Sequence, residues 1–398
     1  MSKVFLKKGK DESVKRFHPW IFSGAIFKMD GNPEEGDLVE IYNSDGDYVG
    51  CGHYQNATIA VRVLSFDRSA LKSDFWFKSL EAAFTKREHL GLTSGNRTNC
   101  YRLVHGEGDN LPGLIIDYYN GRAVIQCHST GMYRNRADIC QSLKKLYGDS
   151  LISVYDKSAQ TIPGRERDSH SDGYLFGTPG DGEVSENGIS FIVNWEVGQK
   201  TGFFLDQREN REMVKRYSKG KRVLNLFCYT GGFSLYALSG GASLVHSVDS
   251  SKKALEMLDS NLKLNVESNL ISADSIHKSY CTDAIEFLRS VEQNSYDLMI
   301  VDPPAFAKHR DALRTALRAY QRLNAQAISK ISSGGIIFTY SCSQAVDKIS
   351  FAQAIFSAAA QTGRRVSIIG RLTQPADHPV NIYHPEGEYL KGLILYVE

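Results

Sequence analysis

The sequence lacks any long apolar run. A helix that spans a membrane needs about 18–20 consecutive apolar residues, and stretches such as Leu298–Val301 and Ile336–Phe338 are far shorter. The N-terminal residues are basic, but no apolar segment of signal-peptide length follows them. We therefore expect a cytoplasmic protein without a membrane partner.

Closely paired cysteines are also missing. The chain has seven cysteines, and no two of them are separated by only two residues. This spacing argues against a zinc ribbon or a CxxC redox site, and no metal is expected. An odd number of cysteines without an export signal is typical of reduced thiols, most of which are small core residues.

Net charge is small, at +2 over 398 residues, of which 42% are hydrophobic and 23% charged. These values are ordinary for a globular chain, and the length predicts about two to four domains. The charge is nevertheless uneven, because residues 1–20 carry six basic side chains and two acidic ones. Such a cluster favours contacts with phosphate, with a solvated surface as the alternative. The six basic residues are Lys3 and the five that we expect to contact phosphate, Lys7, Lys8, Lys10, Lys15 and Arg16.

Three regions with different patterns follow one another. Residues 1–73 contain short alternating runs such as Asp37–Tyr42, which predict a small β-rich domain. Residues 74–188 begin with helical spacing over Asp74–Leu90 and continue with strand-like runs, which predicts an α/β domain. In residues 189–398 strands and helices alternate, which predicts βαβ units and a parallel sheet covered on both faces.

Chemistry-bearing residues follow four predicted strands of the third region. Ligands of such sheets bind beyond the carboxyl ends of the strands, so these residues are expected to form one site. The four strands are Arg222–Phe227, Leu244–Asp249, Leu298–Asp302 and Ile336–Ser341.

After the first of these strands, the dinucleotide fingerprint G-x-G-x-x-G is absent, which weakens the case for a NAD-dependent oxidoreductase. Gly231 and Gly232 instead form a turn that allows positive φ and close approach to a ligand. Asp249 ends the second strand, where an acid can accept hydrogen bonds from ribose hydroxyls. Together these features favour nucleoside binding over the structural alternatives, a tight βα turn and a helix cap.

The remaining two strand ends carry an acid and a thiol. Asp302 is followed by Pro303 and Pro304, which stiffen the loop, and then by Phe306, which can stack on a flat ring. Cys342 follows the last strand, where a nearby cation or helix N-terminus can lower the pKa of a thiol. A small buried residue is the alternative interpretation of this cysteine.

Taken together, the motifs resemble those of class I S-adenosylmethionine-dependent methyltransferases, and most closely the bacterial 23S ribosomal RNA cytosine-C5 methyltransferase RlmI family. This resemblance implies an N-terminal PUA domain (1–73), a central α/β domain (74–188) and a Rossmann-like catalytic domain (189–398). It also implies a 23S ribosomal RNA substrate and a homodimer. The matching segments are His18–Ala25, Gly106–Leu114, Lys200–Arg208, Leu224–Phe233, Asp302–Pro304, Ser341–Ser343 and Ala376–Pro379.

The resemblance further implies roles for single residues. Cys342 is the expected nucleophile, which adds to carbon 6 of cytosine so that carbon 5 can attack a methyl sulfonium. Asp302 is expected to hold the base, together with Pro303, Pro304 and Phe306. Residues implied in binding S-adenosylmethionine are Arg208, Phe227, Tyr229, Thr230, Gly231, Phe233, Asp249, Ser250, Asp283 and Asp302.

Position 305 departs from related enzymes. Many RNA cytosine-C5 methyltransferases carry a second cysteine directly after Asp-Pro-Pro, and members of the resembling family often carry lysine there, whereas this chain has Ala305. The base that removes the carbon-5 proton is therefore unassigned. Two alternatives stay open: an RNA guanine methyltransferase, which needs no thiol nucleophile, and a non-catalytic RNA-binding assembly factor. In either case His18 and Trp20 are expected to be mainly structural, with Trp20 in a core.

Overall fold

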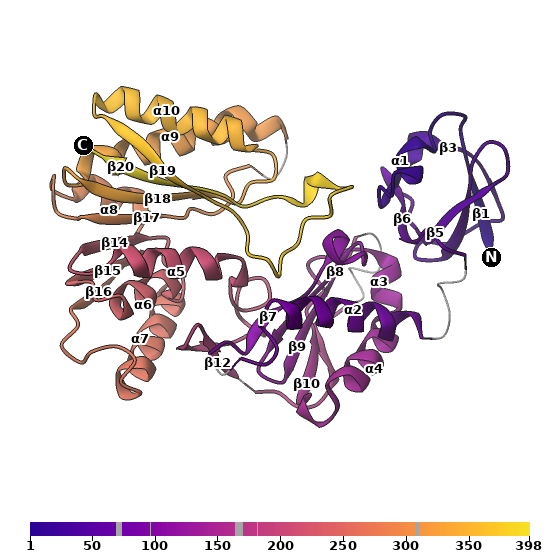
Figure 1. The fold of residues 1–398 in the computed structure, drawn as a ribbon, viewed down its shortest axis with the longest axis horizontal. Coiled ribbons are helices and arrows are strands. Elements are labelled where there is room, and N and C mark those ends of the chain that lie inside the picture. The colour runs from indigo at the N-terminus through magenta and orange to yellow at the C-terminus, as the bar shows by residue number, and fades with distance from the viewer. Residues whose placement is uncertain (69–73, 96, 164–169, 181, 308–309) are drawn as a thin grey trace. The chain divides into compact units, whose positions relative to one another are not determined.

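The computed structural model describes residues 1–68, 74–95, 97–163, 170–180, 182–307 and 310–398. Its contacts divide the chain into two units, which we describe separately (Figure 1). Both units are built from discontinuous segments. The first unit contains residues 1–184, 193–205 and 376–387, and the second contains residues 185–192, 206–375 and 388–398.

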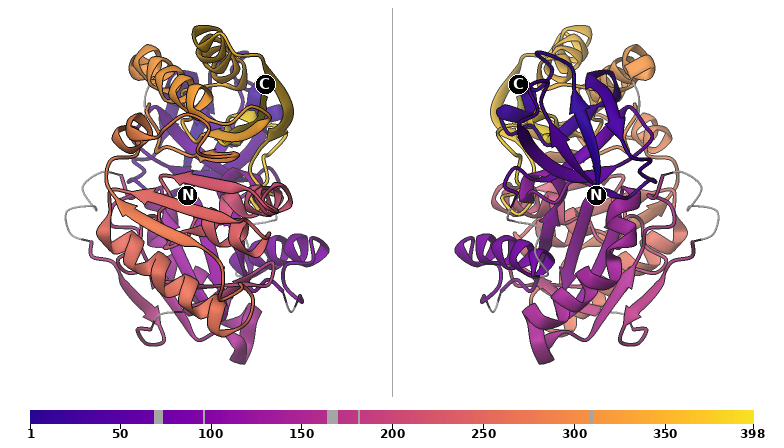
Figure 2. Two further views of the ribbon diagram at one scale, coloured as in Figure 1. Left: turned by 90° about the vertical axis from the view of Figure 1, so that its left-hand side faces the viewer. Right: turned by 90° about the vertical axis from the view of Figure 1, so that its right-hand side faces the viewer.

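An N-terminal six-stranded sheet forms one part of the first unit, in the order β2-β6-β5-β4-β1-β3 (Figure 2). Alternating side chains such as Val39 and Ile41 point into its apolar core, which confirms the β-rich region predicted from the sequence. A short helix, α1 (Glu12–Lys15), adds Val14 to this core. The strands are β1 (Ser2–Leu6), β2 (Trp20–Phe22), β3 (Ile26–Asp30), β4 (Leu38–Tyr42), β5 (Tyr48–Tyr54) and β6 (Ile59–Ser65).

A second sheet of the first unit has five strands in the order β11-β10-β9-β8-β7. The helix predicted over Asp74–Leu90 is present as α2 (Phe75–His89), which packs beside α4 (Arg136–Tyr147). The strands are β7 (Cys100–His105), β8 (Leu114–Tyr119), β9 (Arg122–Cys127), β10 (Ser153–Asp156) and β11 (Gly173–Phe176), and a short helix α3 (Thr130–Arg134) precedes α4.

A buried arginine ties residues 376–387 to this second sheet. Arg87 is completely buried on α2 and donates hydrogen bonds to both carboxylate oxygens of Asp109, with N–O distances of 2.6 and 2.7 Å. The same guanidinium donates to the carbonyl oxygen of Asp377 at 2.7 Å. Asp377 in turn accepts the backbone N–H of Arg102 at 3.0 Å. These contacts explain why a segment so distant in sequence belongs to the first unit.

The second unit is built on a seven-stranded sheet in the order β16-β15-β14-β17-β18-β20-β19. The first five strands in this order are parallel, β20 is antiparallel to β18, and β19 is antiparallel to β20. The chain order reverses next to β14, as in doubly wound Rossmann-like sheets, which confirms the predicted fold class. The strands are β14 (Arg222–Leu226), β15 (Leu244–Asp249), β16 (His277–Cys281), β17 (Leu298–Val301), β18 (Gly335–Ser341), β19 (Val366–Leu372) and β20 (Lys391–Val397).

Helices of the second unit flank these strands, and several of them bury an apolar stripe. On α9, for example, Ala316, Tyr320, Leu323 and Ala327 recur at helical spacing and are buried in the main core. The helices are α5 (Arg208–Tyr217), α6 (Gly232–Ser239), α7 (Lys252–Glu267), α8 (Ala284–Ser290), α9 (Leu313–Lys330) and α10 (Lys348–Thr362). A small hairpin, β12 (Gly182–Glu186) with β13 (Ile189–Val193), precedes them.

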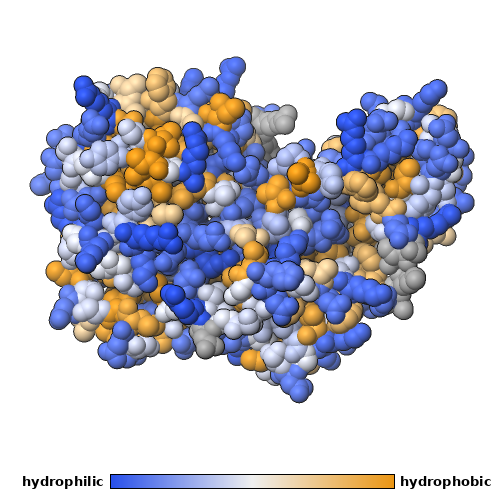
Figure 3. All heavy atoms as spheres, in the orientation of Figure 1, coloured by the Kyte–Doolittle hydropathy of each residue, from blue (hydrophilic) through white to orange (hydrophobic). Residues whose placement is uncertain are grey.

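Apolar side chains gather on the surface around α10, β19 and β20 (Figure 3). Phe356 on α10 is 73% exposed, and Ile368 and Ile369 on the edge strand β19 are also exposed. An apolar patch of this kind is typical of an interaction surface. No helix among the described residues is long and apolar enough to cross a membrane.

We expect Arg87→Met to lower the free energy of unfolding by about 3–5 kcal/mol, because it leaves the buried Asp109 carboxylate without its bidentate partner. Equilibrium urea unfolding of the full chain measures this loss. The matched control is Lys78→Met on the same helix, where the lost ion pair with Asp74 is exposed and contributes little. Equal losses in the two variants would contradict the importance of the buried pair.

Candidate functional site

Four motif-bearing loops lie at one edge of the second unit's sheet. The strands β15, β14, β17 and β18 are parallel neighbours, so their carboxyl ends meet at the same edge. Asp249 ends β15, the Gly231–Gly232 turn follows β14, Asp302 follows β17, and Cys342 follows β18. The structure thus brings together the strand-end residues that the sequence singled out.

The loop after β14 has an unusual backbone. Phe227 and Tyr229 have φ values of 59° and 47°, and Gly231 has a φ of 83°. Positive φ in bulky residues is uncommon and concentrates at functional turns. At position 231 a Cβ atom would lie 2.5 Å from Cγ of Leu258, so only glycine is accommodated. The loop is therefore a tightly specified turn that leads directly into α6.

Side chains from two other elements hold this turn. Asp249 accepts the backbone N–H of Tyr229 at one carboxylate oxygen and that of Ser251 at the other, both at 2.9 Å. Asn261 on α7 donates to the carbonyl oxygen of Thr230 at 3.1 Å. Each carboxylate oxygen has a second lone pair, so Asp249 can still accept hydrogen bonds from a ligand.

The other predicted cofactor residues differ in exposure. Asp283 is exposed and caps α8, where one carboxylate oxygen accepts the N–H groups of Ile285 and Glu286, both at 2.9 Å. Ser250 is also exposed. Phe233 is buried, with its ring centroid 5.6 Å from that of Tyr340 on β18. One carboxylate oxygen of Asp283 thus caps α8, and the other is available to a ligand.

Asp302 is tied to the segment that precedes the sheet. Gln207 Nε2 donates to Asp302 Oδ2 at 2.9 Å, and Asn210 Nδ2 donates to Gln207 Oε1 at 2.6 Å. Arg208, at the first position of α5, is buried. The Asp-Gln-Arg motif therefore reaches the Asp-Pro-Pro loop across 95 residues of chain. Sequence reasoning did not find this bond.

The loop that carries Cys342 is anchored on both sides of the cysteine. Ser341 and Ser343 are completely buried, and each hydroxyl is 3.0 Å from the hydroxyl oxygen of Tyr320. Cys342 between them is only partly buried, and its Sγ lies 4.0 Å from the carbonyl oxygen of Pro303. The two serines thus hold the backbone while the thiol faces the Asp-Pro-Pro loop.

Phe306 shares the same anchor. Its ring centroid lies 4.7 Å from that of Tyr320, and the N–H of Ala307 is 3.3 Å from the hydroxyl oxygen of Ser343. Pro303 is buried, whereas Pro304 and Ala305 are exposed. The structure therefore gives Phe306 a packing partner of its own, in addition to any role in stacking on a base.

Lys391 is a functional candidate that sequence reasoning missed. It begins β20, is paired with Ser341 in the antiparallel ladder, and is only 5% exposed. Its Nζ donates to the carbonyl oxygen of Ser343 at 2.6 Å, so the ammonium flanks the loop of Cys342. Burial lowers the pKa of Lys391 to about 8, and the nearby Cys342 opposes this shift. In the sequence, this residue was indistinguishable from a polar strand end.

The N-terminal basic residues divide into two groups. Lys8 and Lys10 are exposed, and Lys7 donates to the carbonyl oxygen of Gly24 at 2.9 Å. Lys15 and Arg16 lie in ion pairs within or beside α1, with Asp11 at 2.7 Å and Glu12 at 3.7 Å respectively. We infer that Lys8 and Lys10 are the most available of the five for contact with phosphate.

Trp20 does not lie in the apolar core of the N-terminal sheet, so the expected core packing was wrong. Its indole N–H donates to Glu107 Oε1 at 2.8 Å, and its ring lies 4.2 Å from that of His384. The neighbouring Ile21 takes the core position instead. The reason is strand alternation, which sends successive side chains to opposite faces.

Family models match both parts of the chain. A model described as an S-adenosylmethionine-dependent methyltransferase matches residues 101–388, and one described as a PUA-like domain matches residues 4–66. Two curated relatives are both named ribosomal RNA large subunit methyltransferase I. The relative from Aeromonas hydrophila is 38% identical and the alignment covers 98% of each chain. The relative from Photobacterium profundum is 38% identical and the alignment covers 99% of each chain.

Two solved structures share the fold over the full length of both chains. A methyltransferase crystallised in complex with SAH is 24% identical, with a TM-score of 0.84. An S-adenosylmethionine-dependent methyltransferase from Streptococcus mutans is 23% identical, with a TM-score of 0.82. At these identities the likeness concerns the fold.

We expect iodoacetamide to modify Cys342 and the exposed Cys281 before the five buried cysteines. Lys391→Met should slow alkylation of Cys342 at pH 7, by about tenfold for each unit that the ammonium lowers the thiol pKa. Above pH 8 the difference should shrink, because Lys391 loses its proton there. Peptide mass spectrometry measures both rates, and Cys281 is the internal control. Equal alkylation rates at Cys342 in parent and variant would show that Lys391 does not affect the pKa of the Cys342 thiol.

Proposed function

Since the chain belongs to the ribosomal RNA large subunit methyltransferase I family, whose members use S-adenosylmethionine, we propose that it methylates carbon 5 of a cytidine in 23S ribosomal RNA. The observation that carries this proposal is the placement of Cys342. A partly exposed thiol stands between two buried serines, faces the Asp-Pro-Pro loop, and has a buried lysine beside it. A merely structural cysteine needs none of these neighbours.

The residues at the sheet edge suit an adenosyl ligand. The Gly231–Gly232 turn brings backbone close to the strand end, and Asp249 offers acceptors for ribose hydroxyls. Asp283 offers a second carboxylate, next along the sheet edge after β16. When bound, S-adenosylmethionine supplies an electrophilic methyl group.

In the proposed mechanism the thiolate of Cys342 adds to carbon 6 of cytosine. This addition converts the ring into an enamine-like species whose carbon 5 is nucleophilic. Asp302, held by Gln207, hydrogen-bonds the cytosine edge and stabilises the charge that develops in the adduct. After methylation, a base takes the carbon-5 proton, the double bond between carbons 5 and 6 re-forms, and the bond from carbon 6 to sulfur breaks to release the thiolate. Lys391 favours the thiolate before addition and after release, because its ammonium flanks the same loop.

The alternative of an RNA guanine methyltransferase needs no thiol nucleophile. Under that alternative, Asp302 and the Pro303–Pro304 backbone would hold the base and Cys342 would be dispensable. The presence of an anchored thiol beside the Asp-Pro-Pro loop favours cytosine. A cytoplasmic location and a homodimer stay predictions.

Cys342→Ser should reduce turnover to near background while leaving fold and cofactor binding intact, because a serine hydroxyl stays protonated at neutral pH. Methyl transfer to unmodified 23S ribosomal RNA fragments measures this effect, with Cys281→Ser as the matched control. The parent should also form a covalent adduct with RNA that carries 5-fluorocytidine. Near-normal turnover of Cys342→Ser, or no adduct at Cys342, would refute the covalent mechanism and favour the guanine alternative.

Asp249→Ala should weaken S-adenosylmethionine binding by about 1.5–3 kcal/mol, since it removes hydrogen bonds to a charged acceptor. Calorimetric titration measures the affinity, and Asp259→Ala on the exposed face of α7 is the control. Asp249→Asn separates the loss of the negative charge from the loss of support for the turn. The amide keeps one acceptor for the backbone of the turn but lacks the charge. Unchanged affinity in a folded Asp249→Ala protein would remove Asp249 from the ribose site.

Replacing Lys8 and Lys10 together by glutamine should reduce the salt dependence of RNA affinity. Each lost phosphate contact lowers the slope of log affinity against log salt by about 0.7 on single-stranded RNA, so two contacts give about 1.4. Fluorescence anisotropy over a range of salt concentrations measures the slope. The control replaces Lys263 and Lys278, which are exposed on the second unit, by glutamine. Identical slopes for the parent and the Lys8/Lys10 variant would show that these lysines do not contact phosphate.

A further inference from the structure

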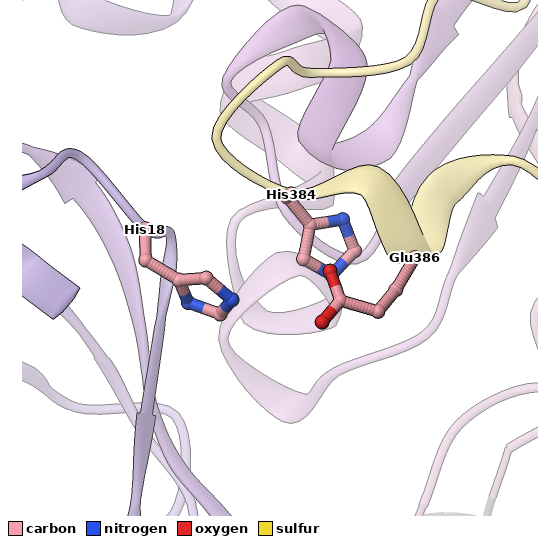
Figure 4. A group of neighbouring side chains, drawn as sticks. All are labelled: His18, His384 and Glu386. Atoms are coloured by element: carbon pink, nitrogen blue, oxygen red, sulfur yellow. The ribbon is translucent and has the colours of Figure 1, made fainter.

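Two histidines and a glutamate meet in the first unit, which does not contain the methyltransferase sheet. His18 lies just before β2, whereas His384 and Glu386 lie in the segment 376–387. Each offers one nitrogen or oxygen atom, and these atoms all lie within 4.8 Å of one another. The carboxylate of Glu386 lies beside the two imidazole rings (Figure 4).

His384 is the most informative member of this cluster. Its side chain is only 3% exposed, yet neither ring nitrogen has a hydrogen-bond partner among the described residues. Buried polar atoms are nearly always hydrogen-bonded, and an orphaned pair on one ring requires an explanation. Oε2 of Glu386 lies 3.9 Å from His384 Nε2, which is too long for a hydrogen bond. A bound ion between these groups would give one of the two ring nitrogens a partner.

His18 contributes the second imidazole. Its Nδ1 accepts the backbone N–H of Trp20 at 3.1 Å and lies 3.2 Å from the carbonyl oxygen of the same residue. Binding of a cation at Nε2 moves the ring proton to Nδ1, which then donates to this carbonyl instead of accepting the N–H. A bond from the second nitrogen to a backbone carbonyl is typical of metal-binding histidines.

Charge and chemistry also favour a cation. Two imidazoles in their neutral, metal-binding form and one carboxylate give a net negative cluster. Glu107 adds a second carboxylate nearby, since it accepts the indole N–H of Trp20, whose ring packs on His384. Two histidines and one glutamate are a common donor set for Zn²⁺, with a water molecule as the fourth ligand.

We propose that His18, His384 and Glu386 bind one divalent transition-metal ion, with Zn²⁺ as the best match to the donors. Zinc bonds of about 2.0–2.2 Å in tetrahedral geometry place ligand atoms about 3.3–3.6 Å apart. The exposed Glu386 side chain is free to make the small movement that this contraction requires. Because the ligands come from residues 18 and 384–386, the ion would fasten the 376–387 segment to the N-terminal sheet.

Metal titration of the chelator-treated full chain tests this proposal, with Co²⁺ as the spectroscopic probe and Zn²⁺ as competitor. We expect one Co²⁺ per chain, a visible d–d band, and no near-ultraviolet charge-transfer band, because all ligands are nitrogen or oxygen. Zn²⁺ should displace Co²⁺ and raise the melting temperature. The experiment does not depend on methyl transfer, so its outcome is independent of the proposed function.

Variants separate this cluster from the seven free cysteines, because thiolates in general are also zinc ligands. Glu386→Gln and His18→Gln should each weaken Co²⁺ binding at least tenfold and abolish the gain in melting temperature. Glu12→Gln and His89→Gln, at exposed positions of the same unit, are the matched controls. Glu386 is exposed, so its variant tests the site without risk to the fold. Absence of stoichiometric binding, a thiolate charge-transfer band, or unchanged affinity in Glu386→Gln would each overturn the proposal.

Discussion

The hydroxyl group of Tyr320 anchors both loops on which the candidate active site depends. From its buried position on α9 it is hydrogen-bonded to Ser341 and Ser343, and its ring supports Phe306 from the neighbouring loop. Without this common anchor, the buried hydroxyls of Ser341 and Ser343 would need other partners. The anchor ties together the loops that follow β17 and β18, so that the thiol of Cys342 lies against the Asp-Pro-Pro loop.

Much of this arrangement could be predicted from the sequence because it depends on local patterns. The strand predicted over Arg222–Phe227 is present as Arg222–Leu226, with Phe227 already in the turn, and Leu244–Asp249 is a strand as predicted. The glycine turn between β14 and α6 lies where glycine spacing placed it. Once parallel strands are assumed, their carboxyl ends must share an edge. The position of Asp249, Asp302 and Cys342 at one edge therefore follows from strand order, without any knowledge of side-chain contacts.

What could not be predicted depends on contacts between distant residues. The helix α5 is mostly charged and gives no apolar stripe, yet Arg211 is buried because Glu186, from β12, pairs with it at 2.7 Å. The strand β16 is polar along its length and looks like a loop. The partnership of Gln207 with Asp302 and that of Lys391 with Ser343 likewise require the sheet register, which one sequence does not reveal.

Lys391 also bears on the problem that Ala305 creates. With alanine at this position, no side chain directly after Asp-Pro-Pro can take the carbon-5 proton. In the proposed mechanism the negative thiolate raises the proton affinity of Lys391, whereas burial lowers it. When sulfur bonds to carbon 6, its charge disappears and the buried ammonium becomes a stronger acid. When the thiolate leaves, the ammonium is stabilised again. Because its pKa lies near 8, the buried Lys391 can lose or gain a proton near neutral pH as the charge on the sulfur changes. A surface lysine with a pKa near 10.4 stays protonated throughout.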